Sequence, residues 1–225
     1  MNSSKEFEHF TDSQIIERIL AGENQFYELL IRRNNAFLYR IGRSYDYNHH
    51  DVEDLMQETY ISAYKNLSSF KHLSSFKTWI TRIMLNHCFH KKQKHAYKNE
   101  VLTENYSNEK SQPMFHNSSG TGKTVLNKEL GHVLENALNQ IPEDYRLIFT
   151  LRELNGHSVS ETAQATDLSE TNIKVKLSRA KGMLRKEIEK MYSPEDIYEF
   201  NLIHCDRMVE RVISAISENN FKTEA

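Results

Sequence analysis

Residues 158–185 read SVSETAQATDLSETNIKVKLSRAKGMLR, and they predict two helices joined by a short turn. Ser158 and Glu161 have the spacing of a capping box, which marks the start of the first helix. Ser169 is a residue type that caps the start of the second helix. Apolar side chains then recur at helical spacing, at Ile173, Leu177, Ala180 and Leu184. A short capped helix, a turn and a longer helix predict a helix-turn-helix.

The second helix of this motif is strongly basic, although the chain as a whole has a net charge of −2. Its cationic residues are Lys174, Lys176, Arg179, Lys181, Arg185, Lys186 and Lys190. Clustered Lys and Arg on one helix indicate contact with nucleic-acid phosphates. In such motifs the first residues of the second helix reach base edges in the major groove. Those residues are Ser169, Glu170, Thr171, Asn172, Lys174 and Val175. The alternative is a surface helix that is merely basic.

The composition predicts an all-α protein, because 7 Gly and 3 Pro in 225 residues leave little room for the turns of a β fold. This length allows one large domain or two small ones. The sequence has no long apolar run and no signal-peptide pattern at its start, so we expect a cytoplasmic protein without membrane insertion. In that compartment Cys88 and Cys205 are expected to be buried, reduced thiols.

An acidic helix is predicted to open at Asp51. Its apolar residues recur every three or four positions and form one face, whereas Asp51, Asp54 and Glu58 fall on another. The carboxylates repel phosphate, so this helix is not a DNA-binding element. Two interpretations remain, a solvated acidic face and a docking face for a basic protein partner.

Aromatic and basic residues follow the acidic helix. The aromatic ones are Phe70, Phe76 and Trp79, and the basic ones that follow are His87, Lys91, Lys92 and Lys94. Such interleaving suits single-stranded nucleic acid, whose bases stack on rings while its backbone follows the cations. The alternative is that Phe76 and Trp79 are core residues.

Two further patterns are rejected. Residues 119–124 resemble a phosphate-binding loop, but position 117 is Asn where the motif needs Gly. His87, Cys88, His90 and His95 lack a second ligand pair at zinc spacing. We therefore predict no metal, no cofactor and no catalytic residue, and expect a protein that is not an enzyme.

Two blocks of the sequence resemble the extracytoplasmic-function (ECF) sigma factors of bacterial RNA polymerase. The run DVEDLMQETYISAY from Asp51, then Ser69-Phe70, SFKTWI from Ser75 and RIMLN from Arg82 resemble region 2 of this group. The runs IPEDYR from Ile141, LRELNG from Leu151 and NIKVKLSRA from Asn172 resemble region 4. The resemblance covers most of residues 11–190.

The resemblance implies a role for each block. The docking face for the β′ clamp helices of core polymerase would comprise Asp51, Asp54, Leu55, Gln57 and Glu58. The −10 promoter element would be recognised and opened by Phe70, Lys71, Ser74, Ser75, Phe76, Trp79 and Asn86. The −35 element would be read, near the β flap, by Arg152, Ser169, Glu170, Thr171, Asn172, Lys174, Val175, Lys176, Ser178 and Arg179. An anti-sigma factor is a further expected partner.

The sequence also departs from the family pattern. Asp167 stands at a turn position that is often Gly, and Asp tolerates a left-handed backbone better than most residues. Thr162 and Thr166 replace apolar residues that are usual in the first helix, which predicts a looser helix-turn-helix. The tail with Cys205-Asp206-Arg207 is expected either to pack on region 4 or to bind a regulatory partner.

The expected organisation is two small helical domains, with region 2 over residues 1–92 and region 4 over 126–192. A flexible linker over 93–125 would join them, and a helical extension would follow over 193–225. Two rival functions remain open, a regulator that uses the same helix-turn-helix without polymerase, and an adaptor whose helix-turn-helix is vestigial.

Overall fold

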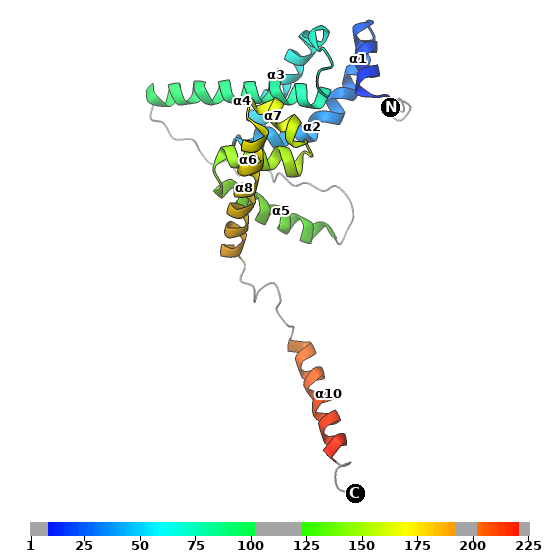
Figure 1. Cartoon of the computed structure of the whole chain (residues 1–225), viewed down its shortest axis with the longest axis vertical. Helices are drawn as coiled ribbons and strands as arrows, with labels where there is room; N and C mark the ends of the chain where they lie inside the picture. Colours follow the sequence, from blue (N-terminus) through cyan, green and yellow to red (C-terminus); the bar gives the residue numbers. More distant parts are fainter. Residues whose placement is uncertain (1–8, 102–122, 192–201, 221–225) are drawn as a thin grey trace. The chain divides into compact units, whose positions relative to one another are not determined.

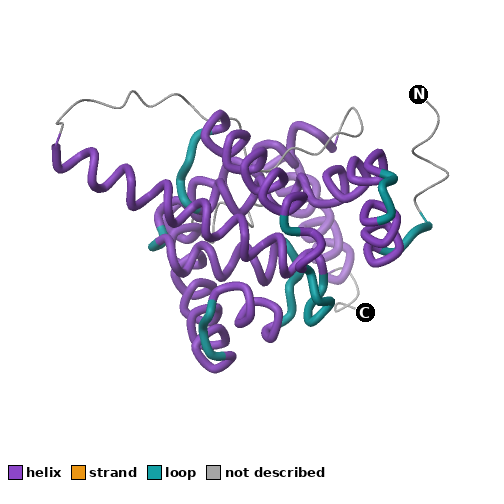
Figure 2. The backbone as a smooth tube through the Cα atoms, turned by 90° about the horizontal axis from the view of Figure 1, so that it is seen from above, coloured by secondary structure: helices purple, strands orange, loops and turns teal. Residues whose placement is uncertain are grey.

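A computed structural model describes residues 9–101, 123–191 and 202–220 of the chain. Every regular element in these ranges is helical, as the composition predicts (Figures 1 and 2). The elements are α1 (Asp12–Leu20), η1 (Asn24–Phe26), α2 (Tyr27–Ser44), α3 (His49–Lys65), η2 (Leu67–Ser69), α4 (Phe76–Val101), α5 (Lys123–Gln140), α6 (Glu143–Phe149), η3 (Thr150–Leu154), α7 (Val159–Thr166), α8 (Glu170–Met191) and α10 (Leu202–Asn220). By its contacts the chain divides into two compact units, residues 1–185 and 186–225.

Helices α1 to α4 form the first helix group of the larger unit. Thr11 and Gln14 make a capping box at the start of α1, as the Thr-Asp-Ser-Gln sequence favours. The core of this group is built from fully buried aliphatic side chains. They include Ile15, Ile16, Leu30, Leu38, Ile41, Leu55, Ile80 and Met84. This core fixes the backbone of α3, which carries the expected docking residues, and that of α4, which carries Phe76, Trp79 and Asn86 of the expected −10 residues.

Helices α5 to α8 form the second helix group, and the predicted helix-turn-helix is confirmed. Ser158 and Glu161 make the capping box of α7, and the Ser169 hydroxyl accepts from the backbone N–H of Asn172 at 3.2 Å. Asp167 ends α7 with φ 55° and ψ 29°, the left-handed conformation expected of it. Gly156, with φ +67°, follows the end of the preceding helix, a position where glycine is favoured.

The two threonines of α7 are well accommodated. Thr162 is fully buried and its hydroxyl donates to the carbonyl of Ser158 at 2.8 Å. Thr166 donates to the carbonyl of Thr162 at 2.7 Å. Because both hydroxyls are satisfied within the helix, they cost little in the core. These bonds count against the expected looseness of the motif.

One predicted helix start was wrong, and the helices on either side of the expected linker reach into it. Helix α3 begins at His49, because Asn48 and not Asp51 supplies the cap: its side chain accepts from the backbone N–H of Asp51 at 2.9 Å. Helix α4 continues through residues 93–101, which were expected to begin the linker, and α5 includes residues 123–125. Polar residues such as Lys, Gln and Glu are good helix formers, so a polar composition alone does not end a helix. Residues 102–122 lie outside the described ranges.

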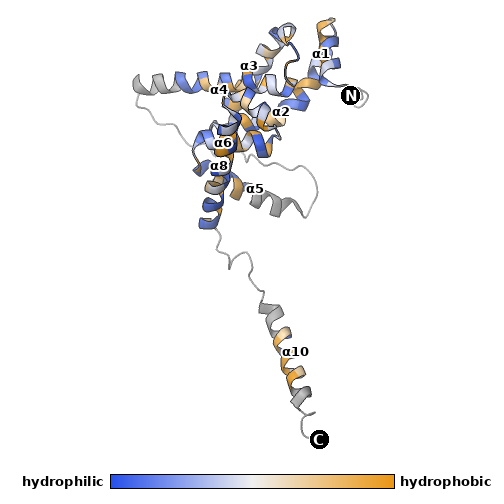
Figure 3. Ribbon diagram, viewed as in Figure 1, coloured by the Kyte–Doolittle hydropathy of each residue, from blue (hydrophilic) through white to orange (hydrophobic). Residues whose placement is uncertain are grey.

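The smaller unit includes α10. Within it, Met208, Val209, Val212, Ile213 and Ile216 are between 48 % and 56 % exposed, and Figure 3 shows this apolar band. What α10 binds stays a prediction.

Cys88 is fully buried, as expected, and burial raises the pKa of its thiol to about 12. The side chain of Cys205 lies outside the described residues. None of the described helices is long and apolar enough to cross a membrane.

Candidate functional site

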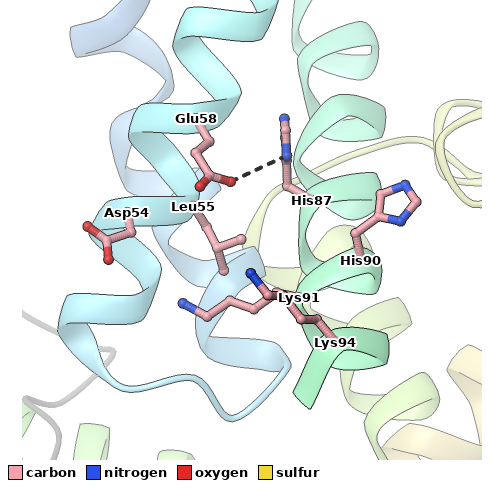
Figure 4. Close-up of a pocket in the computed structure, with 7 residues that line it drawn as sticks. All are labelled: Asp54, Leu55, Glu58, His87, His90, Lys91 and Lys94. Carbon is pink, nitrogen blue, oxygen red and sulfur yellow. Dashed lines mark ion pairs between the residues drawn. The ribbon is translucent and has the colours of Figure 1, made fainter. Parts of the chain in front are cut away.

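The acidic side chains of α3 line one wall of a hollow of about 430 Å³ between α3 and α4 (Figure 4). Asp54 and Glu58 are exposed on this wall, and His87, His90, Lys91 and Lys94 of α4 line the other. Glu58 lies 3.6 Å from His87, an ion pair when His87 is protonated. Asp51 accepts from Lys91 at 2.6 Å. Asp54 and Gln57 are therefore the most available of the expected docking residues.

Leu55 is the exception among the expected docking residues. Its side chain is only 2 % exposed and belongs to the core. It contributes to the hollow as part of the floor, so its role is to position α3. The helical spacing already places Leu55 on the apolar face of α3, apart from the acidic residues, and only the resemblance implied a docking role for it.

Sequence reasoning missed an apolar continuation of the same surface. Ile61 is 55 % exposed and Tyr64 is 39 % exposed. With Tyr27 and Ile31 of α2 they line a second hollow of about 570 Å³, which Gln57 also borders. A usable signal was present, since Ile61 lies one helical turn after Gln57 and off the core face of α3.

The three expected −10 aromatics lie together, but two of them are in the core. Phe70 is 8 % exposed and Phe76 is 3 % exposed. Their ring centroids lie 5.1 Å and 5.7 Å from that of Trp79, which is partly exposed. For Phe76 the core alternative is thus correct, and neither buried ring is a free stacking platform. Both rings instead support the loop that follows Phe70.

That loop presents other side chains to the surface. Leu73 is 85 % exposed, and Lys71, His72 and Ser75 are exposed as well. His72 has φ 55°, which turns the chain at the loop tip. Ser74 is partly exposed, and Asn86 is exposed on α4 two helical turns after Trp79. Leu73 was missed because a single apolar residue in a polar loop resembles a buried anchor, and no sequence pattern singled out His72.

The first turns of α8 are open to solvent. Every expected base-reading residue there is exposed, namely Ser169, Glu170, Thr171, Asn172, Lys174 and Val175, and so are Ser178 and Arg179. Ile173, Ala180 and Leu184 are buried and fix the helix against its neighbours. The helix therefore offers a polar, cationic face with a rigid backbone, as major-groove recognition needs.

Two of the expected −35 residues are engaged within the chain. Lys176 is paired with Asp144 and lies 5.1 Å from the centre of the Tyr145 ring. Arg152 is half-buried and donates to the carbonyl of His157. Their cationic heads must exchange these partners before they reach a phosphate.

Comparisons with known proteins agree with this arrangement. The family model described as Sigma-70 region 2 matches residues 30–96, and the one described as Sigma-70, region 4 matches residues 132–184. The chain belongs to the sigma-70 family, in its ECF group. The first match covers α3, α4 and the aromatic loop, and the second covers the helix-turn-helix. Below, region 2 means the first matched segment, residues 30–96, and region 4 means the second, residues 132–184.

Curated relatives of this ECF sigma factor resemble most of its length. It is 26 % identical over 185 residues to the ECF RNA polymerase sigma-E factor of Haemophilus influenzae, covering 81 % of this chain and 97 % of the relative. It is 27 % identical over 185 residues to the sigma-E factor of Escherichia coli, and the match covers 81 % of this chain and 96 % of that factor.

Two solved structures share the fold. CnrH, solved in complex with the cytosolic domain of CnrY, has a TM-score of 0.57 and 21 % identity, covering 80 % of this chain and 97 % of CnrH. The sigma factor RpoE of Bartonella quintana, solved with the anti-sigma factor NepR, has a TM-score of 0.58 and 20 % identity. The match covers 75 % of this chain and 97 % of RpoE.

Proposed function

We propose that this sigma factor directs core RNA polymerase to promoters, with α3 docking on the polymerase, α8 reading the −35 element and the 70–76 loop opening the −10 element. The observation that carries the proposal is the pair of surfaces of opposite charge on one chain. An exposed acidic face on α3 fits a basic protein partner, and an exposed cationic helix, α8, fits DNA.

The docking step is supported by the available groups on α3. Asp54, Gln57 and Glu58 are exposed, while Ile61 adds apolar area beside them. Charged groups around an apolar centre are typical of specific protein interfaces. The partner expected from family membership is the pair of β′ clamp helices. An anti-sigma factor stays a predicted partner, and the hollow beside Tyr27 and Tyr64 suits an amphipathic helix of such a protein.

Recognition of the −35 element is supported by the residue types at the start of α8. Asn172 can pair with adenine, Lys174 with guanine and Glu170 with the amino group of cytosine. The cations farther along the helix suit phosphates, which position the protein without reading sequence.

Opening of the −10 element is supported by the loop between η2 and α4. Leu73 is apolar and almost fully exposed, Lys71 supplies a cation, and the buried Phe70 and Phe76 hold the loop in place. Apolar side chains can insert between bases and partly unstack them, at a cost of a few kcal/mol per step. Trp79 and Asn86 lie on α4 behind the loop, where a displaced base can stack and form hydrogen bonds.

A pull-down with purified core polymerase tests the docking step. We expect the wild-type chain to be retained and Asp54→Arg to be retained much less, because the change reverses a charge on the docking face. Glu17→Arg on α1 is the matched control, since it makes the same change of charge on another exposed position. Equal retention of both variants would remove α3 as the docking face. Failure to retain the wild type would favour a polymerase-independent regulator or an adaptor.

A further inference from the structure

Two histidines lie against carboxylates of the acidic face of α3. The Nε2 of His49, in the first turn of α3, lies 3.2 Å from a carboxylate oxygen of Glu53. The Nδ1 of His87, on α4, lies 3.6 Å from a carboxylate oxygen of Glu58, the contact drawn as a dashed line in Figure 4. The two glutamate side chains are 51 % and 64 % exposed, so a partner of α3 can reach them. Each of these two acids therefore shares its place on the surface with an imidazole ring.

The second nitrogen of each ring faces a hydroxyl group. The Nδ1 of His49 lies 3.1 Å from the hydroxyl oxygen of Tyr39 on α2, and the Nε2 of His87 lies 3.1 Å from that of Ser62 on α3. A hydroxyl group can donate to a neutral ring nitrogen and can accept from a protonated one. Each site can therefore hold its histidine, neutral or protonated, in the same position.

Other charged groups near the two rings come from α2, α3, α4 and α5. Those near His87 line the same hollow, and they are Asp54, His90, Lys91 and Lys94. Those near His49 are its neighbour His50 and the ion pair of Arg43 with Glu135, both of which act on the Tyr39 hydroxyl. Carboxylate, Lys and Arg side chains ordinarily keep their charge between about pH 5.5 and 7.5, whereas imidazole ordinarily titrates there. The charge at the two contacts therefore changes with the histidines in this range.

Protonation of either ring offsets a charge of the acidic face. An imidazolium in contact with a carboxylate forms an ion pair with it, so an approaching cation is attracted less strongly. Asp51 provides the contrast, because it accepts from Lys91 at 2.6 Å and a lysine ordinarily carries its charge throughout this range. The two histidine pairs therefore depend on pH in a way that a lysine pair does not.

We propose that His49 and His87 are positioning residues of the docking face, which hold Glu53 and Glu58 and set the charge that α3 presents to a basic protein partner. The inference rests on the proposed function, and it adds Glu53 to the expected docking residues. The cations of the partner and the protons of the two rings compete for the same carboxylates. Docking therefore releases protons, and it weakens as the pH falls.

The dissociation constant of the full chain from purified core polymerase, measured at several pH values, tests this inference. An exposed charge pair changes a binding constant by up to about fivefold, so we expect the wild type to bind about fivefold more weakly at about pH 5.5 than at about pH 7.5. The variant His49→Gln/His87→Gln has no titrating ring at either contact. Whatever its affinity at about pH 7.5, it should lose much less of that affinity as the pH falls.

The matched control is His50→Gln/His90→Gln, which removes two exposed imidazoles from the same two helices. In Figure 4 the ring of His90 points away from Glu58, so this control should keep the pH dependence of the wild type. All three proteins keep the buried His157, so any effect of that residue on folding at low pH is common to them. Equal pH dependence in the wild type and in His49→Gln/His87→Gln would overturn the inference and leave the proposed function standing.

A second variant tests the place of Glu53 on the docking face. Glu53→Gln should weaken binding at neutral pH, whereas Glu17→Gln, which makes the same change at an exposed position on α1, should not. Binding of Glu53→Gln as tight as that of the wild type would remove Glu53 from the docking face, and with it the role of His49. Failure of the wild type to bind core polymerase at any pH would contradict the proposed function itself, and the inference with it.

Discussion

At the scale of single residues, the proposed function assigns base reading to the first residues of α8 and phosphate contact to the cations that follow. Lys174 is exposed near the start of the helix, whereas Lys186 is exposed about three turns later. We predict that Lys174→Ala lowers discrimination between −35 sequences by about 1 to 3 kcal/mol. Lys186→Ala should weaken binding to all sequences alike. Competition binding of the polymerase complex on mutated promoters measures both, and unchanged discrimination in Lys174→Ala would exclude this residue from base reading.

His157 is the residue whose titration should report on the contact between the regions. It is 1 % exposed and lies 3.2 Å from the Thr81 hydroxyl, with Lys77, Arg152 and Glu161 as the charged groups around it. Burial of the imidazole is the main cause that lowers its pKa from 6.5 to about 4, and the positive charge of Lys77 is the second cause. The unfolded chain therefore binds a proton below pH 6.5 that the folded chain does not bind until about pH 4, and stability falls across that window.

We predict that this histidine removes about 2 kcal/mol of unfolding free energy between neutral pH and about pH 5. Urea denaturation at several pH values measures the loss. His157→Gln, which stays neutral, should show a smaller dependence over the same window. An identical pH dependence in both proteins would mean that His157 is not held neutral by burial.

Sequence patterns predicted the polar residues of the second helix group better than the aromatic ones of the first. The capping pair Ser158–Glu161, the cap at Ser169 and the left-handed Asp167 follow from local backbone chemistry, which the sequence carries directly. Phe70 and Phe76 were assigned to DNA but lie in the core. An aromatic side chain next to a helix start can either stack on a DNA base or fill the core. Only the tertiary packing decides between these two environments.

At the scale of elements, the close approach of α2 to α3 depends on Gly42. A Cβ at this position would lie 2.7 Å and 2.9 Å from the two methyl groups of Val52. We predict that Gly42→Ala destabilises the protein by about 1 to 3 kcal/mol, because the stiff Val side chain cannot move aside. Thermal or urea unfolding measures this loss.

Gly182 in α8 is the matched control, because a Cβ there meets nothing within 4 Å. Gly182→Ala should stabilise the helix by about 0.5 to 1 kcal/mol, since Ala loses less backbone entropy. If both substitutions shift stability in the same direction and by the same amount, the packing of α2 on α3 is not controlled by Gly42.

Element boundaries show where sequence reasoning ends. The polar stretch after Lys92 was expected to be linker, yet α4 continues to Val101. Composition indicates that a segment lacks a core face, but a helix can extend without one when its residues are good helix formers. The packing of α7 on α4 was also not predicted, because it combines one small apolar residue of α7, Ala165, with polar contacts such as that between Thr78 and Glu161.

At the scale of the whole molecule, the charges are divided between surfaces for which we propose different partners. The acidic face of α3 and the cationic start of α8 are both exposed in the larger unit, while the cations of α4 are paired with region 4. This division explains how a chain with a net charge of −2 can carry a strongly cationic helix. It predicts that the free chain binds duplex promoter DNA weakly and that core polymerase strengthens the binding, which fluorescence anisotropy with and without core can measure.

The central claim is that this chain gives core polymerase its promoter specificity. The most direct measurement is transcription in vitro by purified core polymerase on a library of randomised upstream sequences, with the transcript ends sequenced. The account predicts transcripts that depend on the chain and share two sequence blocks at a constant spacing, and it predicts that Asp54→Arg abolishes them while Glu17→Arg does not. Transcripts no more frequent or selective than those of core polymerase alone would contradict it.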